Sequence, residues 1–220
     1  MDQTCDLSNQ ISLEEVVEAY YTCRKNKRNT ASAIRFEMNL AANLVELWQD
    51  INRGTYQPGR SIAFVVTNPV CREVFAAQFR DRIVHHLIIN KLEEQMESYF
   101  IDDSYSCRPG KGTFYGQKRV QEMIRECSDN YTCDCWVMKI DIQSFFMSIN
   151  KQLLFECLER FVKSHYHGKD IQMLLWLIRV TVFHRPELDC ERHSPDSFWD
   201  RLPKAKSLFG TDGSHGFPLG

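Results

Sequence analysis

The sequence contains no long apolar run, and no stretch approaches the roughly 18 residues that a membrane-spanning helix needs. Its first ten residues also lack the basic segment followed by an apolar segment that marks a secretory leader. We therefore expect a cytoplasmic protein that has no membrane partner.

The chain also lacks an excess of charge and a disulfide pattern. Its formal net charge is -2, with 25% charged residues, so any nucleic-acid binding would need a local basic face. The nine cysteines are an odd number without the close spacing of a secreted framework, which favours reduced thiols. Zinc is not expected, because neither Cys133 with Cys135 nor Cys190 with His193 has a clear partner pair to complete four ligands.

Apolar residues make up 43% of the 220 residues, which is enough to bury a core. Helical spacing predicts a helix that opens at Ser12, where Ser12 and Glu15 form a capping box. Further helices are predicted over residues 31–51, 83–100, 112–126, 151–162 and 171–183. Strands are predicted over 61–67, 72–75 and 136–142, the first two as a hairpin, while 185–216 shows no periodicity.

The segment Val-Met-Lys-Ile-Asp-Ile-Gln-Ser-Phe-Phe-Met-Ser-Ile-Asn, residues 137–150, carries the most chemical information. An Asp at the end of an apolar strand can hold its carboxylate at the edge of a sheet. There Asp141 and the backbone carbonyl of Ile142 can bind a divalent ion. The same Asp can instead cap the exit turn of the strand. The segment alone leaves both interpretations open.

An apolar strand followed by Asp-Ile-x-x-x-Phe and Ser-Ile-Asn resembles motif A, the third sequence block of reverse transcriptases. The resemblance implies that Asp141 is the catalytic carboxylate, which holds two Mg²⁺ ions or Mn²⁺ in their place, and that the Ile142 carbonyl completes one coordination shell. It implies that Phe146 is the aromatic gate that selects deoxynucleotides. The backbone amides of Ser144 and Phe145 would face the triphosphate of the dNTP. Of the two rings, Phe145 is expected to belong to the core.

Residues 72–86, Arg-Glu-Val-Phe-Ala-Ala-Gln-Phe-Arg-Asp-Arg-Ile-Val-His-His, resemble the first block of the same family. The resemblance implies that Arg72 clamps the triphosphate, a role that suits the planar, permanently charged guanidinium. The alternative is a plain exposed strand residue. Asp81 and Arg82 are expected to form a structural ion pair or helix-start pair.

Residues 103–113, Asp-Ser-Tyr-Ser-Cys-Arg-Pro-Gly-Lys-Gly-Thr, resemble the second block, a turn that enters a helix under the template. The resemblance implies that Arg108, Lys111 and Gly112 contact the template or primer, because basic residues and glycines suit phosphates at a helix start. Basic glycine-rich turns are common. Without its neighbours this segment would be interpreted as a plain loop.

Residues 216–220, Gly-Phe-Pro-Leu-Gly, resemble the start of motif B, a turn behind the templating base and the incoming nucleotide. The resemblance implies that Gly216 and Pro218 contact template or primer and that Leu219 contacts the dNTP. Many members carry glutamine where Leu219 stands. Together with residues 206–209, this feature is similar to bacterial enzymes of diversity-generating retroelements, retrons and group II introns. Loss of an amide there implies looser base discrimination.

Four blocks in the family's order imply an α+β fold, the fingers and partial palm of a right-hand polymerase, helix-rich with a small antiparallel sheet. We expect an N-terminal helical region over 1–59, fingers over 60–135 and a partial palm over 136–220, which stops before the Tyr-x-Asp-Asp hairpin.

The implied function is RNA-directed DNA polymerisation by two metal ions, with an RNA template, a DNA primer and dNTP as partners. The 220 residues alone are expected to be inactive. An accessory protein and self-association stay open, as does a non-catalytic nucleic-acid-binding or oligomerising module.

Overall fold

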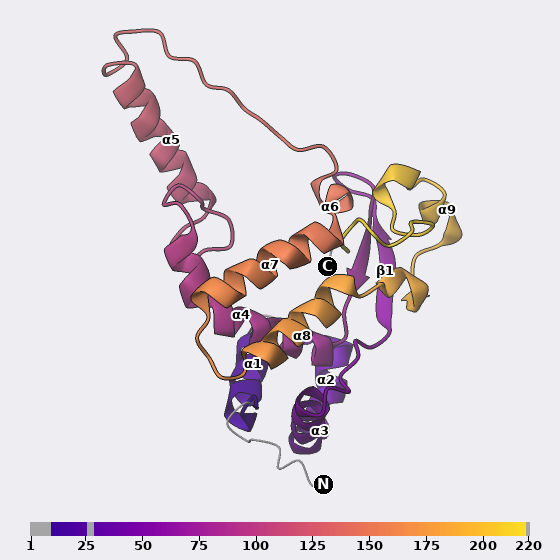
Figure 1. Ribbon diagram of the computed structural model, residues 1–220. Coiled ribbons are helices and arrows are strands. Elements are labelled where there is room, and N and C mark those ends of the chain that lie inside the picture. The colour runs from indigo at the N-terminus through magenta and orange to yellow at the C-terminus, as the bar shows by residue number, and fades with distance from the viewer. Residues whose placement is uncertain (1–9, 26–28, 219–220) are drawn as a thin grey trace. The chain divides into compact units, whose positions relative to one another are not determined.

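The computed structural model describes residues 10–25 and 29–218, which are rich in helix and contain one three-stranded sheet (Figure 1). The main elements are α1 (Leu13–Arg24), α2 (Ala31–Glu37), α3 (Leu40–Asn52), β1 (Ser61–Val66), β2 (Arg72–Ala76), α4 (Phe79–Tyr99), α5 (Thr113–Cys127), α7 (Lys151–His165) and α8 (Ile171–Phe183). Short elements are α6 (Phe145–Ser148), η2 (Pro186–Leu188), β3 (Cys190–Arg192), α9 (Asp196–Trp199) and η3 (Lys204–Lys206). Two compact units form, residues 1–92 with 144–220 and residues 93–143.

In the first unit, α1 begins at the predicted capping box, in which Ser12 and Glu15 exchange side-chain to backbone hydrogen bonds. The single helix predicted over 31–51 is wrong, because two helices, α2 and α3, occupy that range. Asn39 leaves the helical backbone region at the break, and the Asn43 amide donates to the free carbonyl of Phe36 over 2.7 Å. A side-chain amide thus satisfies a backbone acceptor at the break.

A lysine whose side chain is 7% exposed connects three helical segments of the first unit. Lys91 of α4 forms ion pairs with Glu15 of α1 and with Asp170, which precedes α8; its nitrogen lies 2.7 Å from Asp170 Oδ2. Burial opposes the charge of Lys91, but hydrogen bonds to Asp170 and Glu15 outweigh burial and raise its pKa. The ammonium therefore stays charged and holds these segments together.

The predicted hairpin is confirmed, with β1 and β2 antiparallel and Val66 opposite Arg72. The sheet as a whole is mixed, which corrects the expected antiparallel sheet, because β3 adds to the other side of β1 in parallel. The amide of His193 extends this pairing by donating to the carbonyl of Ala63 over 2.9 Å. β1 is therefore the central strand, with both of its edges occupied.

Helices α7 and α8 of the first unit lie side by side (Figure 1). The predicted bounds of α8 are confirmed, and α7 runs three residues further than predicted. α8 is apolar along most of its length and buries five side chains, Leu174, Leu175, Leu177, Ile178 and Val182. A helix with so many buried positions belongs to the interior of its unit.

The second unit contains the end of α4, then α5, then an extended segment (Figure 1). The strand predicted over 136–142 is wrong: these residues form neither helix nor strand, and Trp136 is 92% exposed. A strand needs a neighbour to accept and donate its backbone hydrogen bonds, and no described segment pairs with this one. Across the described ranges, no helix is both long and apolar enough to cross a membrane.

Candidate nucleotide-binding site

The β1–β2 hairpin presents Arg72 to solvent. Arg72 is the first residue of β2, its side chain is exposed, and it forms no ion pair within the part of the chain that the structure describes. A guanidinium in this setting is free to bind an anion. Its predicted role as a triphosphate clamp stays a prediction, since exposure at a strand end is also what the simpler interpretation requires.

The next residue, Glu73, anchors the hairpin from inside. Its carboxylate is buried and accepts hydrogen bonds from the Ser207 hydroxyl over 2.8 Å and from the Leu208 amide. Burial raises the pKa of Glu73, although both hydrogen bonds act in the opposite direction. Successive side chains of β2 point to opposite faces of the sheet. Because Glu73 points inward and is bonded there, Arg72 points outward to solvent.

An aromatic cluster continues this anchor. The Phe75 and Phe209 ring centroids are 5.6 Å apart, and the Arg192 guanidinium lies 4.1 Å from the Phe209 centroid and 4.6 Å from that of Trp199. Such contacts add cation–π attraction to the burial of the rings. Residues 72–76 and 206–209, which the sequence singled out separately, are thus brought together.

A left-handed turn at Ser144 precedes the short helix that carries Phe145 and Phe146. Ser144 has φ 52°, and its carbonyl accepts from the amides of Met147 and Ser148 over 2.9 and 3.0 Å. The expectation that Phe145 belongs to the core is wrong: Phe145 and Phe146 are each 48% exposed. The one-turn helix α6 lies at the surface, so both rings are in contact with solvent. The two rings pack against each other edge to face.

Backbone hydrogen bonds join the segment after Phe146 to the segment around Gly216. The Phe217 amide donates to the Phe146 carbonyl over 2.9 Å, and the Gly216 amide donates to the Ile149 carbonyl over 3.0 Å. An antiparallel bridge between Asn150 and His215 continues the same contact. The segments around Phe146 and Gly216, from the two blocks that resemble motifs A and B, therefore meet in the first unit through contacts that span 65 or more positions.

Gly216 is required at this junction by its backbone and by its surroundings. It has φ +93°, and a Cβ atom there would lie 2.6 Å from Cδ2 of the buried Leu208. Only glycine adopts this conformation without strain and allows so close an approach. Pro218 follows directly, whereas Leu219 lies outside the described residues.

The predicted metal ligands lie in the second unit. Asp141 and Ile142 belong to the extended segment 134–143, and both are exposed. No group of three or more His, Cys, Asp or Glu side chains that could hold a metal forms within the described ranges. Because the two units are described separately, the predicted proximity of Asp141 to Arg72 and Phe146 stays a prediction.

The predicted template-binding turn is also in the second unit, and its charged residues have internal partners. The Arg108 guanidinium, with its side chain 7% exposed, pairs with Glu97 and donates to the carbonyls of Ile101 and Ser104 over 2.7 and 2.8 Å. Lys111 pairs with Asp102 over 2.7 Å. Arg108 therefore holds the turn together, and Gly112, with φ +152°, leads into α5.

Comparisons with known proteins give partial similarity. The chain is 28% identical over 126 residues to the protein YkfC of Escherichia coli (strain K12), which covers 56% of this chain and 32% of YkfC. It is 28% identical over 85 residues to the nuclear intron maturase 1, mitochondrial, of Arabidopsis thaliana, which covers 39% of this chain and 11% of the maturase. No family model matches. The chain is thus similar in part to an intron maturase. It spans a third or less of the curated relatives it matches.

Asp81 and Arg82 lie in the first turn of α4, as expected of a helix-start pair, but they do not form an ion pair with each other. Asp81 is buried and accepts hydrogen bonds from the Tyr56 hydroxyl over 2.8 Å and the Gly59 amide over 3.0 Å, so it anchors the loop before β1. Burial, with the Asp81 carboxylate beside it, raises the pKa of Tyr56. Arg82 instead lines a cavity. Sequence reasoning missed this because neighbouring helix positions face different directions.

Proposed function

We propose that the chain is the fingers and part of the palm of a reverse transcriptase, which adds dNTP to a primer 3′-hydroxyl while it copies RNA. The junction of residues 146–150 with residues 215–217 carries the proposal, because it joins the two segments that resemble consecutive polymerase blocks. Partial similarity to an intron maturase supports it, since the blocks also resemble those of group II intron enzymes. The resemblance extends the proposal to bacterial retroelements.

The proposed roles follow the exposed groups of the first unit. Arg72 would bind the triphosphate as a free guanidinium. The exposed ring of Phe146 would exclude a ribose 2′-hydroxyl, while the turn at Ser144 would present backbone amides to phosphate oxygens. Gly216 and Pro218 would support the templating base. Arg108, Lys111 and Gly112 would line the template path with a turn that their internal contacts make rigid.

A pair of Mg²⁺ ions needs several carboxylate oxygens, and the described residues do not supply them. Asp141 is exposed, and no group of potential ligands gathers among the described side chains. The described residues therefore do not fit a complete two-ion site. We propose that Asp141 and the Ile142 carbonyl are one part of a site whose other ligands lie outside these 220 residues.

Primer extension on an RNA template tests the proposed function. We expect no extension by the 220-residue chain, and extension by a longer polypeptide that contains it and the Tyr-x-Asp-Asp hairpin. Asp141→Asn in that polypeptide should abolish extension, whereas Asp134→Asn, which removes an exposed carboxylate from the same extended segment, should leave it intact. Equal activity of the two variants would refute the catalytic role of Asp141.

A non-catalytic module is the second candidate, and one observation favours it. The second unit exposes apolar side chains that a partner would cover, among them Phe114, Trp136, Met138, Ile140 and Ile142. Concentration-dependent self-association in sedimentation measurements, without extension by any longer polypeptide, would favour this candidate over the polymerase.

A further inference from the structure

The first unit contains a cavity of about 250 Å³, and of the residues that line it only Pro218 has a part in the polymerase roles proposed above. Polar side chains from three separate elements line it: Ser61 from β1, Arg82 and His85 from α4, and Thr181 from α8, with His184 just after α8. Apolar walls come from Phe75, Phe217 and Pro218. Five polar groups from distant parts of the sequence thus converge on one space.

These polar groups have few protein partners. The Arg82 Nε donates to the Ala77 carbonyl over 3.1 Å, and its terminal nitrogens form no ion pair in the described chain. The side chains of Ser61, His85, Thr181 and His184 form no hydrogen bond with any described residue. Ser61 is nevertheless 3% exposed. His85 is exposed, and Arg82, Thr181 and His184 are half-buried, so solvent or a ligand can supply the hydrogen bonds that the protein does not.

The lining of the cavity carries one fixed positive charge, while Asp81, Glu187, Asp189 and Lys151 act on its histidines from outside the lining. Burial lowers the pKa of both His85 and His184, against an opposing effect of the nearby Asp81 carboxylate. Both shifts favour the neutral imidazole, which can donate or accept a hydrogen bond. Of the described residues that line the cavity, Arg82 alone carries a fixed charge.

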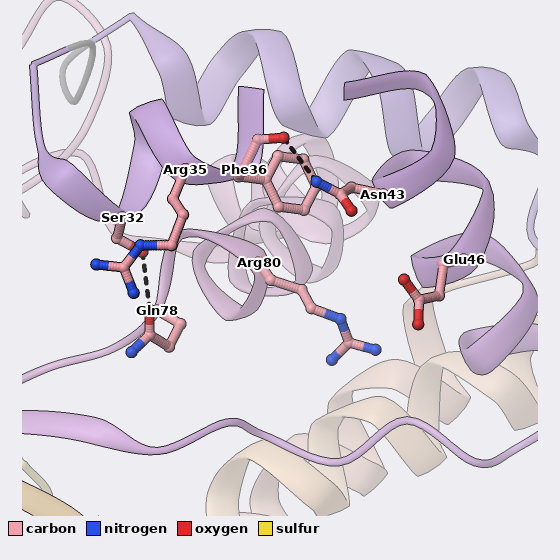
Figure 2. Close-up of a pocket in the computed structure, with 7 residues that line it drawn as sticks. All are labelled: Ser32, Arg35, Phe36, Asn43, Glu46, Gln78 and Arg80. Carbon is pink, nitrogen blue, oxygen red and sulfur yellow. Dashed lines mark hydrogen bonds between the residues drawn. The ribbon is translucent and has the colours of Figure 1, made fainter. Parts of the chain in front are cut away.

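A second hollow in the same unit is less suited to binding an anion. It has a volume of about 260 Å³ and is lined by Arg35, Glu46 and Arg80 among others (Figure 2). Arg80 is already paired with Asp50 over 2.5 Å, and Glu46 brings a negative charge. This hollow therefore offers an anion much less than the cavity around Arg82 does.

We propose that the cavity around Arg82 binds one phosphodiester group of a nucleic-acid strand. One guanidinium surrounded by neutral donors matches the single negative charge of a diester, whereas a phosphate monoester carries close to two charges at pH 7. Ser61 and Thr181 supply hydroxyl donors, and Phe217 with Pro218 supplies an apolar wall for the adjoining sugar or base. The proposal rests on the proposed function, and it adds Arg82 to the residues that contact the strand.

Titration with a dinucleotide that contains a single phosphodiester, thymidylyl-thymidine, tests this proposal on the 220-residue chain. Imidazole proton resonances of His85 and His184 report binding by nuclear magnetic resonance, and we expect saturable shifts. Arg82→Gln should weaken binding at least tenfold, and Thr181→Val, which keeps the side-chain volume, about threefold to tenfold. Arg35→Gln, which removes an exposed charge outside the cavity, should change nothing.

Titrations with two further phosphate compounds show which kind of phosphate group the cavity prefers. Inorganic phosphate and thymidine 5′-monophosphate should each bind more weakly than the dinucleotide, and tighter binding of either would overturn the diester assignment. Absence of histidine shifts with all three probes, or equal losses in Arg82→Gln and Arg35→Gln, would overturn the site. A chain that binds the dinucleotide while the longer polypeptide never extends a primer would contradict the proposed function alone.

Discussion

Replacing Gly216 by alanine tests the junction on which the functional proposal rests. The backbone at this position has φ +93°, a conformation that costs an L-residue about 1–2 kcal/mol. The new Cβ would also lie 2.6 Å from Leu208 Cδ2. Leu208 is buried with Ala63 and Phe75 in the core of the sheet, so its side chain must repack to admit the added methyl group. Overpacking of this kind adds roughly 1–3 kcal/mol.

Gly210 provides the matched control. It has φ +86°, but nothing lies within 4 Å of the position of its Cβ. Gly210→Ala should therefore show the backbone cost alone, about 1–2 kcal/mol. Gly216→Ala should lower the free energy of unfolding by a further 1–3 kcal/mol or so, as measured by urea denaturation monitored by circular dichroism.

A double variant isolates the contact. In a protein that already carries Leu208→Ala, Gly216→Ala should lower the free energy of unfolding by less than it does in the unchanged protein. The smaller side chain makes room for the added methyl group. Equal destabilisation by Gly210→Ala and Gly216→Ala would refute the close packing of Gly216 on Leu208. The two polymerase-like blocks would then be joined less tightly than the hydrogen bonds indicate.

Two further predictions concern Glu73 and Phe146. The folded-state pKa of Glu73 lies above its ordinary value of 4.5, so the folded protein binds the proton more tightly, and stability should fall as pH rises through that interval. Glu73→Gln should remove this fall, as urea denaturation at a series of pH values would show; identical profiles for both proteins would contradict it. In the longer polypeptide, Phe146→Val should raise ribonucleotide incorporation relative to deoxynucleotide at least tenfold, with Phe145→Val as control, and an unchanged ratio in primer extension would rule out the gate.

The elements with strong local signals could be predicted from the sequence. The capping box at Ser12, the β1–β2 hairpin and the helices α5, α7 and α8 all follow from capping, periodicity or turn residues. The break between α2 and α3 could not, since Asn39 interrupts an otherwise continuous helical pattern. β3 could not either, because a three-residue strand has too little pattern, and its register depends on β1.

The candidate site divides in the same way. Arg72 could be placed on an exposed strand end from alternation alone, and the structure describes it there. The burial of Glu73 against Ser207 and Leu208 depends on a contact between distant segments, which local patterns do not encode. The predicted strand over 136–142 failed for a related reason, because apolar alternation does not supply a pairing partner.

The parallel addition of β3 has a consequence for synthesis on the ribosome. The Val65 amide donates to the Ser194 hydroxyl, 129 positions later in the chain. At ordinary translation speeds, on the order of ten seconds pass between the emergence of β1 and that of its second neighbour. During that time the nascent hairpin carries an open edge, to which another nascent chain can add in place of β3. We therefore expect the yield of folded protein to depend on the timing of translation as well as on the final contacts.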